Sequence, residues 1–400
     1  MLEGLDDVPW AKLRHALGPA DDVPDLVRDL ASDDDERRAK AQYDLYGTLW
    51  SHGTVYEATP HAIPFLVEIL EHAEYVDRPW LLIYLSALAN GASHHEVHQL
   101  HGIYDEERDT AEFAAKIAQD QSWVDGAKRA VRKGLPTYQR LLSHDDPATR
   151  ASAAFLLGGL RDDAPTTIAV LSGRLASESV PVVRASVAEA LGTLGDEPLT
   201  RVRLLDLVEH DNAPYVRWAA ARSLAFLAAD DVDDAVVEAL VFALKDPSSI
   251  EPLHAESPWA EENTPAATAR ALLAVGPDKG ARAVPALAKM LAGSDPSSAL
   301  AIAETLLGLA FDTSEPARAD FDDLDSTQQL VVRTLAHSDA AWMMGGNMSS
   351  LLDRHRLPRS ASSLQTFAGI ATRRVGADTL GGLGPGDSMS GATIPRDWLD

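Results

Sequence analysis

The sequence predicts an all-α fold: an α-α superhelix, or solenoid, of stacked antiparallel helix pairs. Segments beginning at Pro147, Pro181 and Pro214 repeat one pattern, and these prolines are separated by 34 and 33 residues. A period of this size is typical of arrays in which one supersecondary unit recurs. The 400 residues are 46% apolar and only 6% aromatic. No segment shows the apolar–polar alternation of a half-buried β-strand.

The first helix of each unit is defined by apolar residues that stand 2, 6, 10 and 13 places after its proline. Steps of four, four and three put these residues on one helical face. Proline suits a first helical turn, where its missing N–H has no intrahelical partner, and Asp146 and Asp295 are predicted N-caps. The predicted buried positions are Thr149, Ala153, Leu157, Leu160, Val183, Val187, Leu191, Leu194, Val216, Ala220, Leu224 and Leu227.

Small residues at recurring positions predict that neighbouring helices approach closely. Ala154, Ala188 and Ala221 stand seven places after their prolines, and Gly158 and Gly192 stand eleven places after theirs. Apolar segments at residues 167–175, 202–208 and 236–244 supply a second helix for each unit. Each unit is therefore expected to pack against a neighbour on both sides.

This pattern resembles the HEAT repeat family, whose first helix carries a proline, then an arginine, with an acidic residue after the helix. The resemblance implies that Arg184 and Arg217 reach acidic residues of the preceding unit. The acidic positions would be Asp162, Asp163, Asp196, Asp230 and Asp231. Residues 53–60 and 62–66 are also similar to a segment of actinobacterial HEAT-repeat proteins, and the resemblance covers most of residues 30–310.

We expect one continuous elongated domain with five regions. Residues 1–30 are predicted N-terminal capping helices, and residues 31–136 are diverged helical repeats with a His-rich insertion. Residues 137–310 are HEAT-like repeats, residues 311–371 are C-terminal capping helices, and residues 372–400 are a flexible tail rich in Gly and Ser. Ser32 is a predicted N-cap in a capping box with Asp35. A second insertion, residues 246–265, lengthens the spacing of the prolines, and insertions in solenoids often emerge on a binding face.

The composition restricts the partners and the chemistry. Asp plus Glu number 61 against 35 Lys plus Arg, a net charge of −26, which repels nucleic acid and suits a basic protein partner. The alternative is that this charge serves solubility alone. With no cysteine, disulfides and thiolate chemistry are excluded. Neither a signal peptide nor an apolar run of membrane length is recognisable, which predicts a soluble cytoplasmic protein with no membrane partner.

The sequence contains one candidate metal-binding pattern. His94, His98 and His101 have helical spacing, and Asp105, Glu106 or Glu107 could complete a metal site. The alternative is a solvated histidine-rich loop, and the overall prediction is that the protein has neither metal nor cofactor. No nucleophile elbow, triad order or phosphate-binding loop occurs. We therefore predict no catalytic residues and no enzymatic activity.

Partner binding is predicted on the second helices, which would line a concave acidic groove. The candidate residues there are Arg174, Glu178, Arg203, Asp206, Glu209 and Glu238. Trp259 in the second insertion is a further candidate, since tryptophan often anchors interfaces. His52 and Tyr56 are the last candidates, with the alternative that their segment is a turn that docks Val55 and Tyr56 onto the first units. Trp218 either fills a gap in the stack or marks a contact patch.

The leading functional hypothesis is a non-enzymatic scaffold or adaptor that binds a protein or peptide. A specialised version is an immunity protein that neutralises a basic toxin. A different class is an enzyme subunit similar to the HEAT-like bilin lyases, which handle a tetrapyrrole thioether. A third class is a HEAT-like DNA-base glycosylase, which the negative charge disfavours. The oligomeric state stays open.

Overall fold

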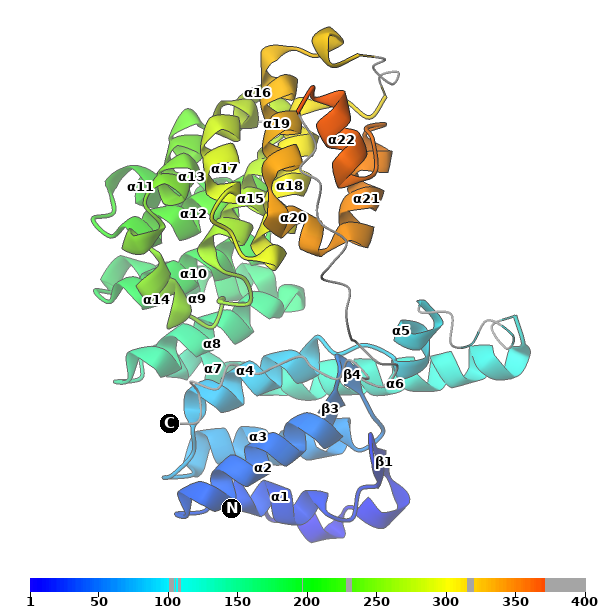
Figure 1. Cartoon of the computed structure of the whole chain (residues 1–400). Helices are drawn as coiled ribbons and strands as arrows, with labels where there is room; N and C mark the ends of the chain where they lie inside the picture. The colour runs from blue at the N-terminus through cyan, green and yellow to red at the C-terminus, as the bar shows by residue number, and fades with distance from the viewer. Residues whose placement is uncertain are drawn as a thin grey trace.

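A computed structural model describes residues 1–100, 104, 106, 109–195, 197–227, 232–314 and 320–370. These residues form a bent stack of helix pairs, which confirms the predicted all-α solenoid (Figure 1). The predicted tail, residues 372–400, lies outside the described residues. In the upper part of the stack, α12, α15 and α18 lie toward the inner side of the bend, while α11, α13 and α17 lie toward its outer side (Figure 1).

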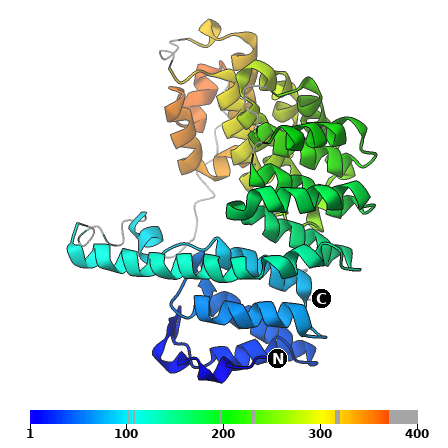
Figure 2. The same cartoon turned by 180° about the vertical axis from the view of Figure 1, so that it is seen from behind.

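The N-terminal part combines short helices with two small hairpins. Its elements are 3-10 turns Leu5–Asp7 and Trp10–Lys12, β1 (Arg14–His15), β2 (Gly18–Pro19), α1 (Val23–Asp29), α2 (Asp35–Thr48), β3 (Trp50–Ser51), β4 (Thr54–Val55), α3 (Thr59–His72), α4 (Arg78–Ala89), α5 (His94–Leu100) and α6 (Ala111–Lys133). α6 packs on α3 and α4 and then projects beyond them (Figures 1 and 2).

The remaining elements form the regular stack and its C-terminal end. The first helices are α8 (Pro147–Gly159), α10 (Pro181–Leu194), α12 (Pro214–Leu227), α15 (Thr264–Val275) and α18 (Pro296–Ala310). The second helices are α9 (Ala164–Ser177), α11 (Pro198–His210), α13 (Asp234–Lys245), α17 (Val284–Leu291) and α19 (Ser326–His337). Shorter helices are α7 (Leu135–Leu141), α14 (Glu251–Ala255), α16 (Pro277–Gly280), α20 (Asp339–Met343), α21 (Gly345–Arg354) and α22 (Ala361–Phe367), with 3-10 turns Arg161–Asp163, Pro247–Ser249, Ala281–Ala283 and Phe321–Asp323.

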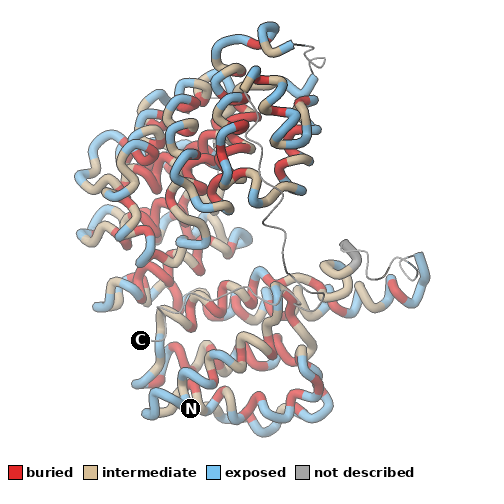
Figure 3. The backbone as a smooth tube through the Cα atoms, viewed as in Figure 1, coloured by how far each residue is buried: buried red, intermediate tan, exposed pale blue. Residues whose placement is uncertain are grey.

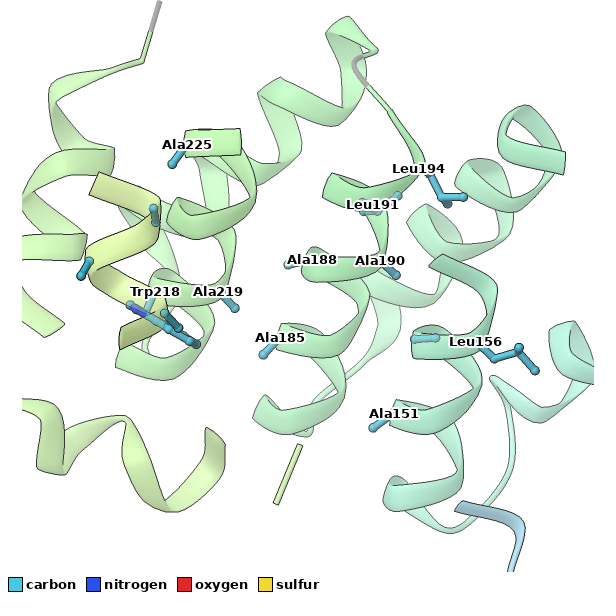
Figure 4. Close-up of a cluster of buried hydrophobic side chains, with 14 of the residues drawn as sticks. Ala151, Leu156, Ala185, Ala188, Ala190, Leu191, Leu194, Trp218, Ala219 and Ala225 are labelled. Atoms are coloured by element: carbon cyan, nitrogen blue, oxygen red, sulfur yellow. The ribbon is translucent and has the colours of Figure 1, made fainter. Parts of the chain in front are cut away.

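The buried face of the first helices is as predicted. Of the twelve positions named from the repeat, eleven are buried in α8, α10, α12 and the residue after α8, and Leu227 is half-buried. Alanines and Leu191 occupy the contacts between these helices (Figure 4). Buried residues run through the packed helices, whereas the projecting end of α6 is largely exposed (Figure 3). The repeat therefore encodes one continuous core.

Glycine sets the close approach of the first helices. A Cβ on Gly158 would lie 2.9 Å from Ala190 Cα, and one on Gly192 would lie 2.5 Å from Ser223 Cβ. Both distances are below van der Waals contact, so no side chain fits at either position without movement of the next helix. The predicted role of these two glycines is confirmed.

Two predicted N-caps are confirmed and one is wrong. Asp146 and Asp295 each accept hydrogen bonds from two backbone N–H groups at the start of α8 and α18. The N-cap of α2 is Asp34, not Ser32, because Asp34 accepts from the N–H groups of Glu36 and Arg37. The Ser32 hydroxyl instead accepts from Asp34 N–H at 3.1 Å.

Two arginines of the first helices bind acidic residues of their own unit, whereas acidic residues of the preceding unit were expected. Arg184 donates to Asp211 at 2.8 and 2.9 Å, and Arg150 donates to Glu178 at 2.9 and 3.1 Å. These acids follow the second helix of the same unit. That helix is antiparallel, so its C-terminal end lies beside the N-terminal arginine, while Asp162 and Asp163 lie a whole helix length away.

Arg217 and Asp163 have other neighbours than the ones expected. Arg217 forms no ion pair among the described residues and lies 5.6 Å from the centre of the Phe242 ring. Asp163 accepts from Arg132 of α6 at 2.6 and 2.7 Å. Asp196, Asp230 and Asp231 lie outside the described residues.

The N-terminal hairpins were not predicted. In the turn between β3 and β4, His52 has φ 51° and Gly53 has φ 87°, and two positive φ angles are typical of a tight two-residue hairpin turn. Val55 is fully buried and Tyr56 is half-buried. The geometry thus matches the structural alternative for this segment, a turn that docks onto the first units.

Candidate partner-binding surface

The second insertion folds back over the first helices. It contains α14, and it connects α13 to α15. Its Trp259 ring meets Phe155 of α8 edge to face, with ring centres 4.8 Å apart. His254 is buried with its ring centre 4.9 Å from that of Trp218 in α12. The insertion therefore reaches back across two helix pairs.

The insertion covers residues that stand eight places after the repeat prolines. In successive repeats these are Phe155, Glu189 and Arg222. The Glu189 carboxylate lies 3.2 Å from Arg222 Nε, and the Arg222 guanidinium lies 5.3 Å from the centre of the Trp218 ring. Burial raises the pKa of Glu189 to about 7, although the charge of Arg222 acts to lower it.

Trp218 fills a gap in the stack. Its ring is 1% exposed, and its indole N–H donates to Thr268 Oγ1 at 2.8 Å. Thr268 stands in α15 at the place where the repeat pattern expects an arginine. The large ring therefore joins α12 to α15, and the alternative that it marks an exposed contact patch is wrong.

A cluster of aromatic rings occupies the contact between α2 and α4. The ring centres of Tyr46 and Trp50 are 4.8 Å apart, those of Tyr46 and Tyr84 are 5.5 Å apart, and those of Trp80 and Tyr84 are 4.9 Å apart. Tyr84 is buried and donates to the Leu45 carbonyl at 2.7 Å. Tyr46, Trp50 and Trp80 are half-buried, so each ring keeps part of its area in contact with solvent.

The insertion brings negative charge toward this cluster. Burial, together with the charge of Glu261, raises the pKa of Tyr46. Residues 246–269 contain five Asp or Glu and neither Lys nor Arg. Residues 1–110 contain 22 acidic and 8 basic residues, a net charge of −14. We call the surface formed by Tyr46, Trp50, Trp80, Phe155 and the insertion the insertion face.

The second helices carry no excess of negative charge, unlike the insertion and residues 1–110. α9, α11 and α13 together contain four acidic residues, Asp206, Glu209, Asp234 and Glu238, and four basic residues, Arg174, Arg201, Arg203 and Lys245. Charge on these helices is therefore balanced, and the acidity of the chain is located elsewhere.

The structure separates the predicted binding residues into two groups. Arg174 donates to Glu178 at 2.8 Å, and Arg203 donates to Ser172 Oγ at 2.9 Å, so both are held by their own chain. Asp206 and Glu209 are exposed beside His210, at 3.2 and 3.9 Å from its Nδ1. Glu238 is exposed on α13.

The predicted residues outside the second helices also lie at separate places in the structure. Trp259 lies on α8 as described. His52 is exposed at the tip of the β3–β4 turn, and the Tyr56 hydroxyl accepts from Thr54 Oγ1 at 2.8 Å. The nine predicted residues therefore do not form one site.

The histidine cluster has a structural explanation. Asp120 of α6 is 2% exposed, and one of its oxygens accepts from Ser93 Oγ, from His95 N–H and from His95 Nδ1 at 2.8 to 3.0 Å. His98 Nδ1 lies 2.9 Å from the His94 carbonyl. Within the described residues no group of three potential metal ligands is arranged to hold an ion. His101, Asp105 and Glu107 lie outside those residues.

The aromatic cluster was missed at the sequence level, although a signal existed. Tyr43 and Tyr46 are three residues apart in α2, Trp50 follows four residues later in β3, and Trp80 and Tyr84 are four residues apart in α4. Tyr43 and Tyr46 therefore share one helical face, and Trp80 and Tyr84 share another. What the sequence could not show is that the two faces meet.

One family model agrees with this fold. Residues 135–225, which run from α7 into α12, match the model of the HEAT repeat family. A crystal structure of an engineered protein aligns at 20% identity over 87% of this chain and 97% of its own, with a TM-score of 0.33. No curated protein matches. Of the helices in the described ranges, none combines the length and apolarity that crossing a membrane requires.

Proposed function

We propose that this protein is a non-enzymatic scaffold that holds a protein or peptide partner on the insertion face. The observation that supports this most strongly is the meeting of three half-buried aromatic rings with an acidic, Lys- and Arg-free insertion. Aromatic residues are enriched at protein interfaces, where a rigid ring covers much area at low entropic cost. HEAT repeats commonly serve as protein-interaction scaffolds.

The charge of the insertion face favours a basic partner. The insertion and residues 1–110 hold much of the negative charge of the chain, so they would attract a basic surface and orient it during encounter. Arg174 and Arg203 do not belong to the proposed contact because they bind Glu178 and Ser172. Glu238, Asp206 and Glu209 lie on the charge-balanced second helices, and we assign them no role. A cytoplasmic location remains part of the proposal.

Site-specific photo-cross-linking in the source organism tests this function. The cross-linking amino acid is placed at Tyr43, which is 73% exposed on the aromatic face of α2, and at Glu256, which is exposed in the insertion. The matched control position is Leu199 of α11, which is 65% exposed. We expect one protein to be cross-linked from both test positions and not from Leu199. Equal cross-linking from all three positions, or none from Tyr43 and Glu256, would contradict the proposal.

A further inference from the structure

We propose that the rings of Tyr46, Trp50 and Trp80, together with the carboxylate of Glu261, form a binding site for a lysine or arginine side chain of a basic protein segment. This inference rests on the proposed function and names the chemistry that the partner must present. It adds a defined site to a general preference for basic proteins.

The rings have the arrangement that a cation needs. Tyr46 lies at the centre, in contact with Trp50 at an interplanar angle of 62° and with Tyr84 at 35°. Trp80 stacks on Tyr84 at 18°. The rings contact each other, and Tyr84 is fixed by its hydrogen bond to Leu45. They are therefore ordered before a ligand binds. A cation within about 6 Å of such ring centres is attracted by their negative faces.

No cation from the described residues lies over the rings of Tyr46, Trp50 or Trp80. Among the described residues, the arginines that lie over aromatic rings are Arg217 on Phe242, Arg222 on Trp218 and Arg333 on Phe321. The basic residues near the cluster in sequence are engaged elsewhere. Arg78 donates to the Ala73 carbonyl at 2.9 Å, and Lys40 pairs with Asp44. Within the described part of the chain, these half-buried rings thus have no cation partner of their own.

Glu261 provides the matching negative charge. Its side chain is exposed and forms no ion pair among the described residues, whereas its neighbour Glu262 pairs with Arg270 at 2.7 Å. Trp259 anchors this part of the insertion on Phe155 of α8. α8 packs directly on α4, since a Cβ on Gly159 would lie 3.2 Å from the Asn90 side chain. The effect of Glu261 on the pKa of Tyr46 agrees with this placement.

The ligand chemistry follows from these groups together. Aromatic faces and a carboxylate both favour a positive charge, and they disfavour phosphate or carboxylate ligands. A flexible aliphatic stem also packs well on a ring while its charged end reaches an acid. Lysine and arginine side chains combine these two properties. A neutral apolar segment would use the rings but would leave Glu261 without a partner.

A peptide titration with charge-matched variants tests the site. The probe is a short peptide of alternating lysine and glycine, compared with peptides in which glutamine or glutamate replaces lysine, at about 150 mM NaCl to screen distant charges. Calorimetry measures the affinity of the full chain. We expect binding of the lysine peptide alone, weakened roughly threefold to tenfold by Glu261→Gln and by Trp80→Leu. Glu238→Gln removes the same charge from α13 and should leave the affinity within about twofold.

Several outcomes would overturn the inference. These are equal effects of Glu261→Gln and Glu238→Gln, binding of the glutamine peptide as tight as that of the lysine peptide, or no binding of the lysine peptide at ~1 mM. If circular dichroism shows that Trp80→Leu does not fold, Trp50→Leu replaces it, and unchanged affinity in a folded ring variant also overturns the site. Cross-linking from Tyr43 that persists in Glu261→Gln would reject the cation site alone, whereas its absence in the parent protein rejects the scaffold function.

Discussion

Glu178 is a buried carboxylate with several hydrogen-bond donors around it. Its side chain is inaccessible to solvent and accepts from Arg150, from Arg174 and from the Val180 N–H at 2.9 Å. Burial acts to raise the pKa of Glu178, but these hydrogen bonds outweigh burial and the net pKa is lowered. A carboxylate with a lowered pKa stabilises the fold above its unfolded pKa, and this contribution is lost as the pH falls through the folded pKa.

Replacement of Glu178 should therefore be costly. Glu178→Gln leaves two arginines without their counter-charge, and we expect the free energy of unfolding to fall by about 3 to 5 kcal/mol. Urea denaturation at neutral pH measures the change. Glu209→Gln, on an exposed residue of α11, is the control and should change stability by less than about 0.5 kcal/mol. Equal losses in both variants would show that the buried pair is not the cause.

The contribution of Glu189 to folding stability has the opposite pH dependence to that of Glu178. Because its folded pKa is raised to about 7 from an unfolded value near 4.5, the folded state retains a proton that the unfolded state releases. Stability contributed by this group therefore falls as the pH rises from about 4.5 to about 7. We expect Glu189→Gln to remove this slope.

Urea titrations of the parent and the Glu189→Gln variant at intervals through this window measure the difference. Burial lowers the pKa of neighbouring His254, so this histidine adds an opposite slope to both proteins, and only the difference between them isolates Glu189. Tyr215 and Arg222 also face Glu189. Parallel stability curves for the two proteins would contradict the assignment.

At the level of helices, spacing is set by the smallest side chains. Gly192→Ala places a methyl 2.5 Å from Ser223 Cβ, so α10 and α12 must separate, and we expect a loss of about 1 to 3 kcal/mol. A Cβ added at Gly173 in α9 would meet nothing within 4 Å. Gly173→Ala should therefore stabilise the protein by about 0.5 to 1 kcal/mol through its backbone entropy. Thermal unfolding compares the two, and a gain from Gly192→Ala would refute the close contact.

Leu191 tests the buried face of the same helix. Its side chain is fully buried between neighbouring helices. Leu191→Ala should cost about 2 to 5 kcal/mol in unfolding free energy. A loss below about 0.5 kcal/mol would show that the repeat face is not packed.

What the sequence predicts at this level depends on the repeat. The apolar positions, the glycines and the two aspartate caps recur in register, so their roles follow from spacing alone. The partner of Arg184 does not follow from spacing, because the pattern indicates acidic residues of the preceding unit, whereas the antiparallel return of α11 brings Asp211 beside Arg184. The hairpin at His52 and Gly53 has no repeat equivalent, and its two positive φ angles depend on a local turn.

For the candidate site, the longer spacing between prolines indicates an insertion that contains Trp259. It does not indicate which helices the insertion packs against. Phe155, Glu189 and Arg222 occupy equivalent places in successive repeats, so a comparison of repeats could identify them as one column. The aromatic cluster joins α2 to α4, which lack the repeat signature, and no spacing connects them. The predicted second-helix groove was based on overall charge, and that charge is concentrated in other segments.

On the scale of the whole molecule, stability should vary along the stack. Each unit of a solenoid contacts mainly its neighbours, so terminal units lose half of their support. We expect amide hydrogen exchange to be slowest in α8, α10 and α12, and faster in α22 and α1. Mass spectrometry of peptides after exchange measures this order. Uniform protection from α1 to α22 would indicate that the chain opens only as a whole.

The contact of Trp259 with Phe155 changes how the molecule should respond to a pulling force. An array with nearest-neighbour contacts peels one pair after another from a free end. Here the link between α13 and α15 is fastened to α8, so α10 and α12 are enclosed in a closed loop of contacts. Stretched between its ends in an optical trap, the protein should release this enclosed segment in a single large extension, after the tryptophan has left α8.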